Sequence, residues 1–238
     1  MRLDKMLSDS GVAARSELKK MIKSGKVTVN GTVVKDPGFH VEGNEDIRVD
    51  GGEVQYRKYI YLLLDKPDEV LTAMEDKRLK TVADLIPGNY KNKKISPVGR
   101  LDYHTTGLLL LTNDGELSHR LTSPRYNVPK VYRIRYEGAP LDGGHVKQCN
   151  DGVLLEDMDE PVRLKPSKLT LTGDNTCELT LYEGKTHEVR RIISSFGRSV
   201  LELRRIKLAS LELLSEEPGS IRELTKDEVS SLYGITGL

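Results

Sequence analysis

A run of four leucines, Leu108 to Leu111, restricts the fold more than any other feature of the chain. Gly107 precedes the run, Thr112 follows it, and no polar residue interrupts it. A short apolar run of this kind is typical of a β-strand buried within a sheet. The chain has 238 residues, which is long enough to build a core around such a strand. No apolar segment approaches the ~20 residues that a membrane-spanning helix requires, so we expect a globular protein.

Short apolar segments alternate irregularly with helical patterns from residue 59 to the C-terminus. The segment 59–64 is expected to open this part as a strand, which ends at Lys66-Pro67. The apolar spacing predicts further strands at 107–112, 131–136, 177–182 and 199–207, and helices near 115–122, 186–196 and 226–233. Because strands and helices do not alternate strictly, residues 59–238 are expected to form an α+β domain on a mainly antiparallel or mixed sheet.

Residues 1–55 predict a separate small unit of two helices followed by a hairpin. Asn30-Gly31 lies between two alternating apolar segments and is favoured in a type I′ turn, since both residues tolerate positive φ. A further strand is expected at Ile47–Val49, and residues 51–58 are expected to be a linker. Apolar residues at three-and-four spacing give each helix one buried face: Leu3, Met6 and Leu7 in the first, and Leu18, Met21 and Ile22 in the second.

The cysteines and the N-terminus narrow the cellular setting. Cys149 and Cys177 show neither paired spacing nor a nearby histidine cluster, so we expect two reduced thiols and neither a zinc site nor a disulfide. The first residues include an acid and no uninterrupted apolar stretch, which argues against a secretory signal. We therefore expect a cytoplasmic monomer without a metal or a membrane partner.

The net charge of +1 conceals two basic segments. Residues 1–35 contain eight Lys/Arg against three Asp/Glu, and residues 185–207 contain seven against two. Such segments are expected to form local surfaces for an anionic partner, although charge alone is equally compatible with solvated helix faces.

The first basic segment carries a family resemblance. The run from Arg2 to Val34 resembles the small RNA-binding domain named after the fourth protein of the small ribosomal subunit. This resemblance implies that the second helix and the following turn present basic side chains to structured RNA. Ala14 departs from the family, which usually has serine there, and its presence is expected to weaken a helix cap. The implied RNA-binding residues are Arg15, Lys19, Lys20, Lys23 and Lys26.

Asp102 lies in the most informative motif, immediately before the leucine strand. Its position at the edge of a core requires a cationic partner or hydrogen-bond donors, because an unpaired carboxylate there would be neutralised. By composition alone, an aspartate that caps a turn is the commoner explanation. The segments 99–102 (GRLD) and 105–108 (TTGL), however, resemble the catalytic motif of the RluA/RsuA pseudouridine synthase superfamily, in its RsuA-type branch. This resemblance implies that Asp102 is the catalytic aspartate, and that the adjacent His104 has only a local role.

Two further motifs resemble parts of the same family's active site. Within 130–132 (KVY), Tyr132 is implied to pack against the target base. Within 183–191 (EGKTHEVRR), Arg190 is implied to pair with Asp102. Taken singly, Tyr132 would be read as a half-buried strand residue and Arg190 as an exposed helix charge. Glu188 departs from the family, which usually has glutamine there, and the change is expected to weaken a local RNA contact.

The resemblance implies isomerisation of uridine to pseudouridine in ribosomal RNA, a reaction that needs no cofactor. Asp102 would act as a nucleophile or a base. If 199–207 is a strand, Arg204 and Arg205 point to opposite faces, so only some basic residues of this segment can touch RNA. Outside the small unit, the residues expected to bind RNA are Arg100, Lys130, Arg191 and Arg205.

The target RNA and the reaction leave alternatives open. The run 115–125 (GELSHRLTSPR) resembles the small-subunit branch of the family, which favours small-subunit ribosomal RNA. The same chemistry on large-subunit RNA is one alternative, and a non-catalytic RNA-binding assembly factor is another. A glycosidase is disfavoured because the motif of Asp102 contains no second carboxylate to serve as a general acid.

Overall fold

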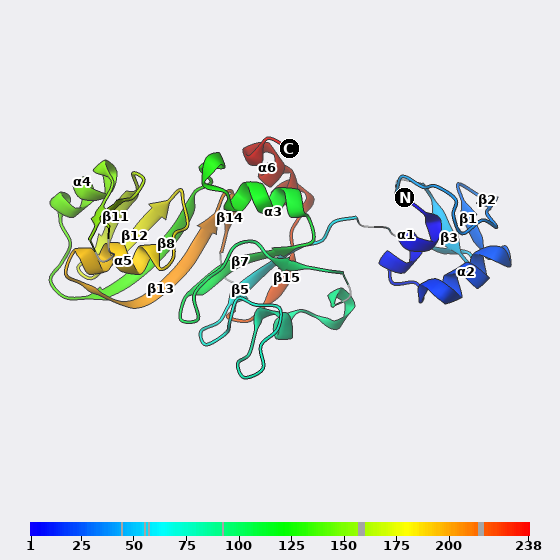
Figure 1. Cartoon of the computed structure of the whole chain (residues 1–238), viewed down its shortest axis with the longest axis horizontal. Coiled ribbons are helices and arrows are strands. Elements are labelled where there is room, and N and C mark those ends of the chain that lie inside the picture. Colours follow the sequence, from blue (N-terminus) through cyan, green and yellow to red (C-terminus); the bar gives the residue numbers. More distant parts are fainter. Residues whose placement is uncertain (44, 55, 57, 92, 157–159, 214–216) are drawn as a thin grey trace. The chain divides into compact units, whose positions relative to one another are not determined.

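The computed structural model describes the chain except for residues 44, 55, 57, 92, 157–159 and 214–216. The chain divides into two compact units, Met1–Ile60 and Tyr61–Leu238 (Figure 1). None of the helices within the described residues is long and apolar enough to cross a membrane.

The first unit consists of two helices packed on a small antiparallel sheet. Its helices are α1 (Leu3–Asp9) and α2 (Arg15–Lys23), and its strands are β1 (Val27–Val29), β2 (Thr32–Val33), β3 (Ile47–Val49) and β4 (Gly52–Glu53). The strand order is β2-β1-β3-β4. Asn30 and Gly31 both have positive φ, as the predicted hairpin turn requires. The expected linker is wrong at its start, because Gly52 and Glu53 pair with β3 instead of leaving the sheet.

Apolar faces of both helices and of β1 and β3 form the core of this unit. Leu3, Leu7, Leu18 and Ile22 are fully buried, whereas Met21 is only partly buried. Ala14 is the N-cap of α2 and makes no side-chain cap bond, as expected from its sequence.

The second unit is built on a mixed sheet with nine strands among the described residues. Its main path runs β11-β12-β8-β13-β7-β5-β15, with β14 paired to β13 and β6 paired to β7. The α+β class on a mixed sheet is therefore confirmed. The strands are β5 (Tyr61–Lys66), β6 (Ser96–Pro97), β7 (Thr106–Thr112), β8 (Lys130–Glu137), β11 (Lys168–Gly173), β12 (Thr176–Leu181), β13 (Ser199–Leu208), β14 (Leu211–Glu212) and β15 (Ile221–Glu223).

Strand β7 holds the leucine run and lies near the middle of this sheet. All four leucines are fully buried, which confirms the expected buried strand. It pairs with β5 antiparallel and with β13 parallel, and Gly107 lies opposite Arg205 in the parallel pair. The loop that precedes β7 therefore emerges beside β13.

Among the described residues, four helices cover parts of the sheet, and one was not expected from the sequence. The expected helices are α3 (Gly115–Thr122), α5 (Glu188–Ser195) and α6 (Lys226–Thr236), and the additional one is α4 (Gly143–Asp151). Short 3-10 helices occupy Val82–Leu85, Gly88–Tyr90 and Pro124–Tyr126, and a two-stranded sheet joins β9 (Leu154–Leu155) to β10 (Val162–Arg163).

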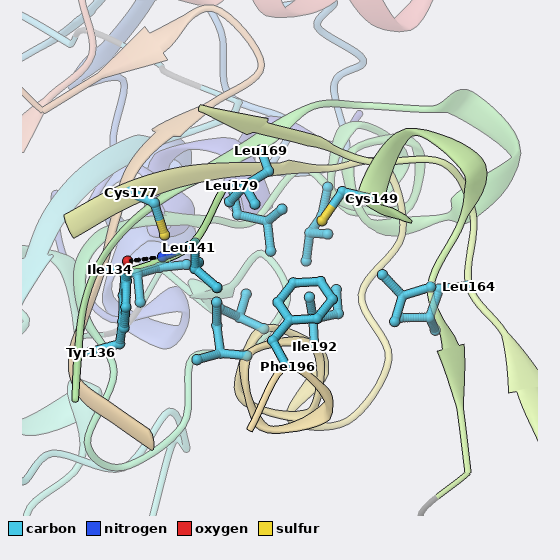
Figure 2. Close-up of a cluster of buried hydrophobic side chains, with 14 of the residues drawn as sticks. Ile134, Tyr136, Leu141, Cys149, Leu164, Leu169, Cys177, Leu179, Ile192 and Phe196 are labelled. Carbon is cyan, nitrogen blue, oxygen red and sulfur yellow. Dashed lines mark hydrogen bonds between the residues drawn. The ribbon is translucent and has the colours of Figure 1, made fainter. Parts of the chain in front are cut away.

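Two apolar clusters hold these helices on the sheet. In one, Leu117 and Leu232 from α3 and α6 pack with leucines of β5 and β7. In the other, Ile192 of α5 and Phe196, which directly follows α5, pack against the apolar face of β8 and β12 (Figure 2). The Tyr136 hydroxyl accepts a hydrogen bond from the Leu141 backbone N–H at 2.9 Å, drawn as the dashed line in that view. This second cluster fixes the start of α5, from which the site is built.

Both cysteines belong to this second cluster. Cys149 and Cys177 are free and buried. Burial raises the pKa of Cys149 to about 11 and that of Cys177 to about 12, so both stay as thiols near neutral pH.

Candidate active site

Asp102 lies in the loop that joins β6 to β7. Its backbone carbonyl accepts a hydrogen bond from the Thr105 N–H at 3.0 Å, and the Thr105 hydroxyl lies 3.5 Å from Oδ2 of its carboxylate. On the other side, the Thr72 hydroxyl donates to the Leu101 carbonyl at 2.6 Å. Asp102 keeps 38% of its side chain exposed, so the loop is anchored on both sides while its carboxylate stays accessible.

Lys66, at the end of β5, holds the same loop by hydrogen bonds. The sequence did not predict this contact. Its fully buried side chain donates from Nζ to the carbonyls of Pro67, Tyr103 and Thr105 at 3.0, 3.2 and 2.9 Å. Burial lowers the pKa of Lys66 to about 8, although the charges of Asp68 and Asp102 act in the opposite direction. A lysine that directly follows an apolar strand was the available signal, since a lysine is fully buried only when its ammonium has partners.

The imidazole of His187 lies beside the Asp102 carboxylate. Nε2 of His187 lies 3.6 Å from Oδ1 of Asp102. His187 precedes α5 and has a left-handed backbone with φ of 51°. This contact was also missed, because residues 85 apart in sequence meet only when α5 is docked on the sheet.

Arg190 reaches the same loop, but its partner there is the backbone of His104 and not the Asp102 carboxylate. Its Nη2 donates to the carbonyl of His104 at 3.3 Å, and within the described part of the chain it forms no ion pair with Asp102. The expected direct pairing is therefore wrong for this structure, because Arg190 leaves the first turn of α5 toward the backbone that follows Asp102. Nδ1 of the His104 imidazole lies 3.0 Å from Oδ1 of Asp68, so this side chain contacts Asp68 and not Asp102.

Tyr132 comes to this site from β8. It pairs in register with Leu179 of β12 and with Arg205 of β13, and its side chain is half-buried. Tyr132 lines the same pocket as Asp102 and Arg190. The structure therefore brings the three predicted catalytic residues together, from a loop, a strand and a helix.

The pocket between these elements has a volume of about 380 Å³, within the usual range for small-molecule sites. Apolar Leu101, Leu181 and Leu203 contribute to its wall, and Arg100, Lys185 and Arg190 contribute cationic side chains. Such a lining suits a flat, partly apolar group attached to an anionic chain.

Comparisons with known proteins agree with this geometry. A family model described as RNA pseudouridylate synthase matches residues 60–195, and the model of the S4 domain matches residues 1–47. The chain belongs to the RNA pseudouridylate synthase family.

Relatives of known name resemble the chain over nearly its whole length. Ribosomal large subunit pseudouridine synthase B of Bacillus subtilis is 39% identical over 98% of this chain and 96% of its own. Ribosomal small subunit pseudouridine synthase A of Vibrio cholerae is 35% identical over 98% of this chain and 100% of its own. A crystal structure of a pseudouridylate synthase superposes with a TM-score of 0.67 at 32% identity, over 98% of this chain and 99% of that one.

The S4 domain of this family member carries five exposed cations expected to bind RNA. Arg15 also contacts the buried Asp4 at 3.2 Å, and Lys26 contacts Asp50 at the same distance. Lys19, Lys20 and Lys23 extend from α2 with exposed side chains. Their role in RNA binding stays a prediction.

Among the four cations of the synthase unit expected to bind RNA, two are placed where RNA cannot reach them. Lys130 and Arg205 are 7% and 2% exposed. Arg205 donates from Nε to the Leu108 carbonyl at 2.8 Å, and Lys130 donates to the Val128 carbonyl at 3.2 Å. Both side chains are buried, so the expectation is corrected for them. Arg100 is exposed at the pocket, and Arg191 is half-buried in α5.

Proposed function

We propose that this chain isomerises a uridine of small-subunit ribosomal RNA to pseudouridine, as a cytoplasmic monomer, with Asp102 as the catalytic carboxylate. The observation that carries this proposal is the meeting of Asp102, Tyr132 and Arg190 around one pocket in a member of the RNA pseudouridylate synthase family.

The reaction breaks the bond between N1 of uracil and C1′ of ribose and forms a bond from C5 to C1′. The proton lost from C5 is balanced by one gained at N1, so there is no net redox change. Asp102 is the accessible carboxylate at the pocket wall, where it can act as a nucleophile or a base. No cofactor is required by this balance.

The target base must leave its stack before it enters the pocket. Extrusion costs a few kcal/mol, and stacking on an aromatic ring returns about 1 to 3 kcal/mol per base. Tyr132 supplies that ring on the pocket wall. Arg100 and Lys185 also line the pocket, and we expect them to bind the flanking phosphates.

The S4 domain would supply affinity for RNA apart from the chemistry. Lys19, Lys20 and Lys23 lie on one short helix and extend into solvent. Contacts to phosphate from such residues anchor RNA with little sequence preference, so the choice of uridine would rest with the synthase unit.

Large-subunit RNA is a second candidate, because a relative of 39% identity is named for that subunit. The run 115–125 supports the small subunit only weakly. Its Leu117 and Leu121 are buried, and Arg120 donates from Nη1 to the carbonyls of Thr236 and Gly237 at 3.0 and 2.7 Å. These side chains therefore serve packing of α3 on the C-terminal segment.

The test is to incubate the protein with unmodified small- and large-subunit ribosomal RNA and with partly assembled particles. New pseudouridines are mapped by carbodiimide-dependent stops of reverse transcription, and Asp102→Asn serves as the control. We expect one stop in small-subunit RNA that disappears with Asp102→Asn.

Other outcomes would change the proposal in defined ways. A stop that depends on Asp102 in large-subunit RNA would keep the reaction and replace the target. A protein that binds these RNAs but yields no stop on any substrate would favour a non-catalytic assembly factor.

A further inference from the structure

Two buried carboxyl groups brace the segment between β12 and α5. Glu183 and Glu188 are 6% and 4% exposed, although they flank four exposed residues, 184–187. All of 184–188 line the pocket. Glu188 of the brace therefore belongs to the same pocket wall as His187.

Each carboxyl group holds a backbone N–H. Oε2 of Glu188 accepts from the Lys185 N–H at 2.8 Å, and Oε1 of Glu183 accepts from the Lys165 N–H at 2.8 Å. Nζ of Lys185 lies 3.8 Å from Oε2 of Glu183. The remaining oxygen of Glu188, Oε1, is buried without a hydrogen-bond donor among the described residues.

Protonation of Glu188 would turn this unpartnered oxygen into a hydrogen-bond donor. Two ionised carboxylates cannot hydrogen-bond to each other, but a carboxylic acid can donate to a carboxylate. Burial raises the pKa of Glu188 to about 7; the Lys185 N–H opposes this rise, while the charge and side-chain hydrogen bonding of Glu183 add to it. The neutral acid is therefore well populated near neutral pH.

Charged groups on the neighbouring strands do not replace this proton. Lys130 of β8 directs its ammonium to the Val128 carbonyl, and the described residues show no ion pair between it and Glu188. Burial and the charge of Arg205 lower the pKa of Lys130 to about 8, and the charge of Glu188 opposes that change. Lys165 meets the brace through its backbone N–H, and Lys185 through Nζ, 3.8 Å from Glu183. The titratable neighbours of Glu188 along the chain are His187, Arg190 and Arg191.

We propose that Glu188 is a positioning residue that works as the neutral acid: it holds the Lys185 N–H beside Glu183 and so fixes the segment that places His187 against Asp102. This inference rests on the proposed function. The 3.6 Å contact between His187 and Asp102 depends on the left-handed backbone at His187, immediately before Glu188. Ionisation of both carboxyl groups would make them repel each other and release that backbone.

The first measurement is the pH profile of kcat and KM. The substrate is transcribed ribosomal RNA labelled with tritium at C5 of uridine, and the readout is release of the label. We expect wild-type kcat to fall above about pH 7, Glu188→Gln to keep most activity and lack this fall, and Glu188→Ala to lose about tenfold in kcat at every pH. Glu116→Gln, an exposed glutamate on α3, is the matched control and keeps the wild-type profile.

The second measurement is independent of activity. An acid whose pKa is raised on folding contributes full stability below its unfolded pKa and loses it as the pH rises through its folded pKa. The Tm of Glu188→Gln minus the Tm of the wild type should therefore increase between about pH 5 and pH 8. If Glu188→Gln does not fold, carbon-13 NMR of glutamate-labelled wild-type protein should show one carboxyl titrating near pH 7.

The two measurements separate this inference from the proposed function. If none of the RNAs releases its label, the proposed function is contradicted. The Tm comparison would still test the role of Glu188. The assignment of Glu188 would be overturned by any of four results. In two of them the wild type and Glu188→Gln have parallel pH profiles, or their Tm difference does not change with pH. In the others Glu188→Gln is folded but inactive, or all glutamates titrate below about pH 5.5.

Discussion

Arg190 contacts the backbone of the loop that carries Asp102. Its guanidinium binds the His104 carbonyl, two residues after Asp102, and also lines the pocket. We expect Arg190→Ala to lower kcat by about 10- to 100-fold while the fold is retained, because a cation near the developing charge is removed. The measurement is single-turnover pseudouridine formation together with a thermal melt.

Arg133→Ala is the matched control for this prediction. Arg133 is an exposed β8 arginine that pairs with Glu178 at 3.4 Å, away from the pocket lining. It should leave the rate unchanged. If Arg190→Ala turns over at the wild-type rate, Arg190 has no role in the reaction.

Gly107 is required by close contact between two strands. It has φ of 100°, and a Cβ placed there would lie 2.3 Å from the Arg205 carbonyl oxygen. We expect Gly107→Ala to lower the free energy of unfolding by about 2 to 4 kcal/mol, through overpacking and a strained backbone. Urea unfolding followed by circular dichroism measures this change. Gly115→Ala is the control, since nothing lies within 4 Å of its Cβ position and it should change stability little.

At the level of elements, α1 and α2 are joined by a buried charge. Asp4 is fully buried and accepts hydrogen bonds from Arg2 and Arg15 at distances of 3.1 to 3.3 Å. The hydrogen bond from Arg2, against burial, is the main cause that lowers the pKa of Asp4 to about 2, and Arg15 adds to the shift. The carboxylate therefore stabilises the helix pair in its ionised form.

The depressed pKa of Asp4 predicts a pH dependence in the first unit. Its contribution is present above the unfolded pKa of about 4 and is lost as the pH falls toward about 2. We expect Asp4→Asn to destabilise this unit by about 2 kcal/mol at pH 7 and by much less near pH 2. Hydrogen exchange of the α1 and α2 amides measures the effect, and equal destabilisation at both pH values would contradict it.

For the whole molecule, binding and chemistry are expected to reside in different units. Replacing Lys19, Lys20 and Lys23 by alanine should weaken RNA binding about 10-fold or more at moderate salt and reduce the slope of log K against log salt by about 2 to 3. The rate on saturating RNA should be unchanged, because the pocket belongs to the synthase unit.

Filter binding at several salt concentrations, followed by turnover at saturating RNA, tests this division. The control is a triple variant at exposed lysines of the synthase unit outside the pocket, Lys77, Lys80 and Lys226. Unchanged affinity of the α2 variant at low and moderate salt would exclude the S4 domain from binding.

The local pattern of the chain predicted most of the elements. The strands around the leucine run and Tyr132, the helices α3, α5 and α6, and the Asn30-Gly31 turn lie close to the expected positions. These features depend on periodicity and backbone preference, which act between residues near in sequence. The motifs likewise predicted that Asp102 and Tyr132 would share one site.

Tertiary structure alone decided which charges face the core. Alternation predicted opposite faces for Arg204 and Arg205, but it did not predict which of them is covered. Parallel pairing of β13 with β7 buries Arg205, while Arg204 reaches across to the buried Asp65 at 3.0 Å. The role of Lys66 and the contact of His187 with Asp102 have the same origin. Burial and pairing of charges depend on contacts between distant segments, which local sequence does not encode.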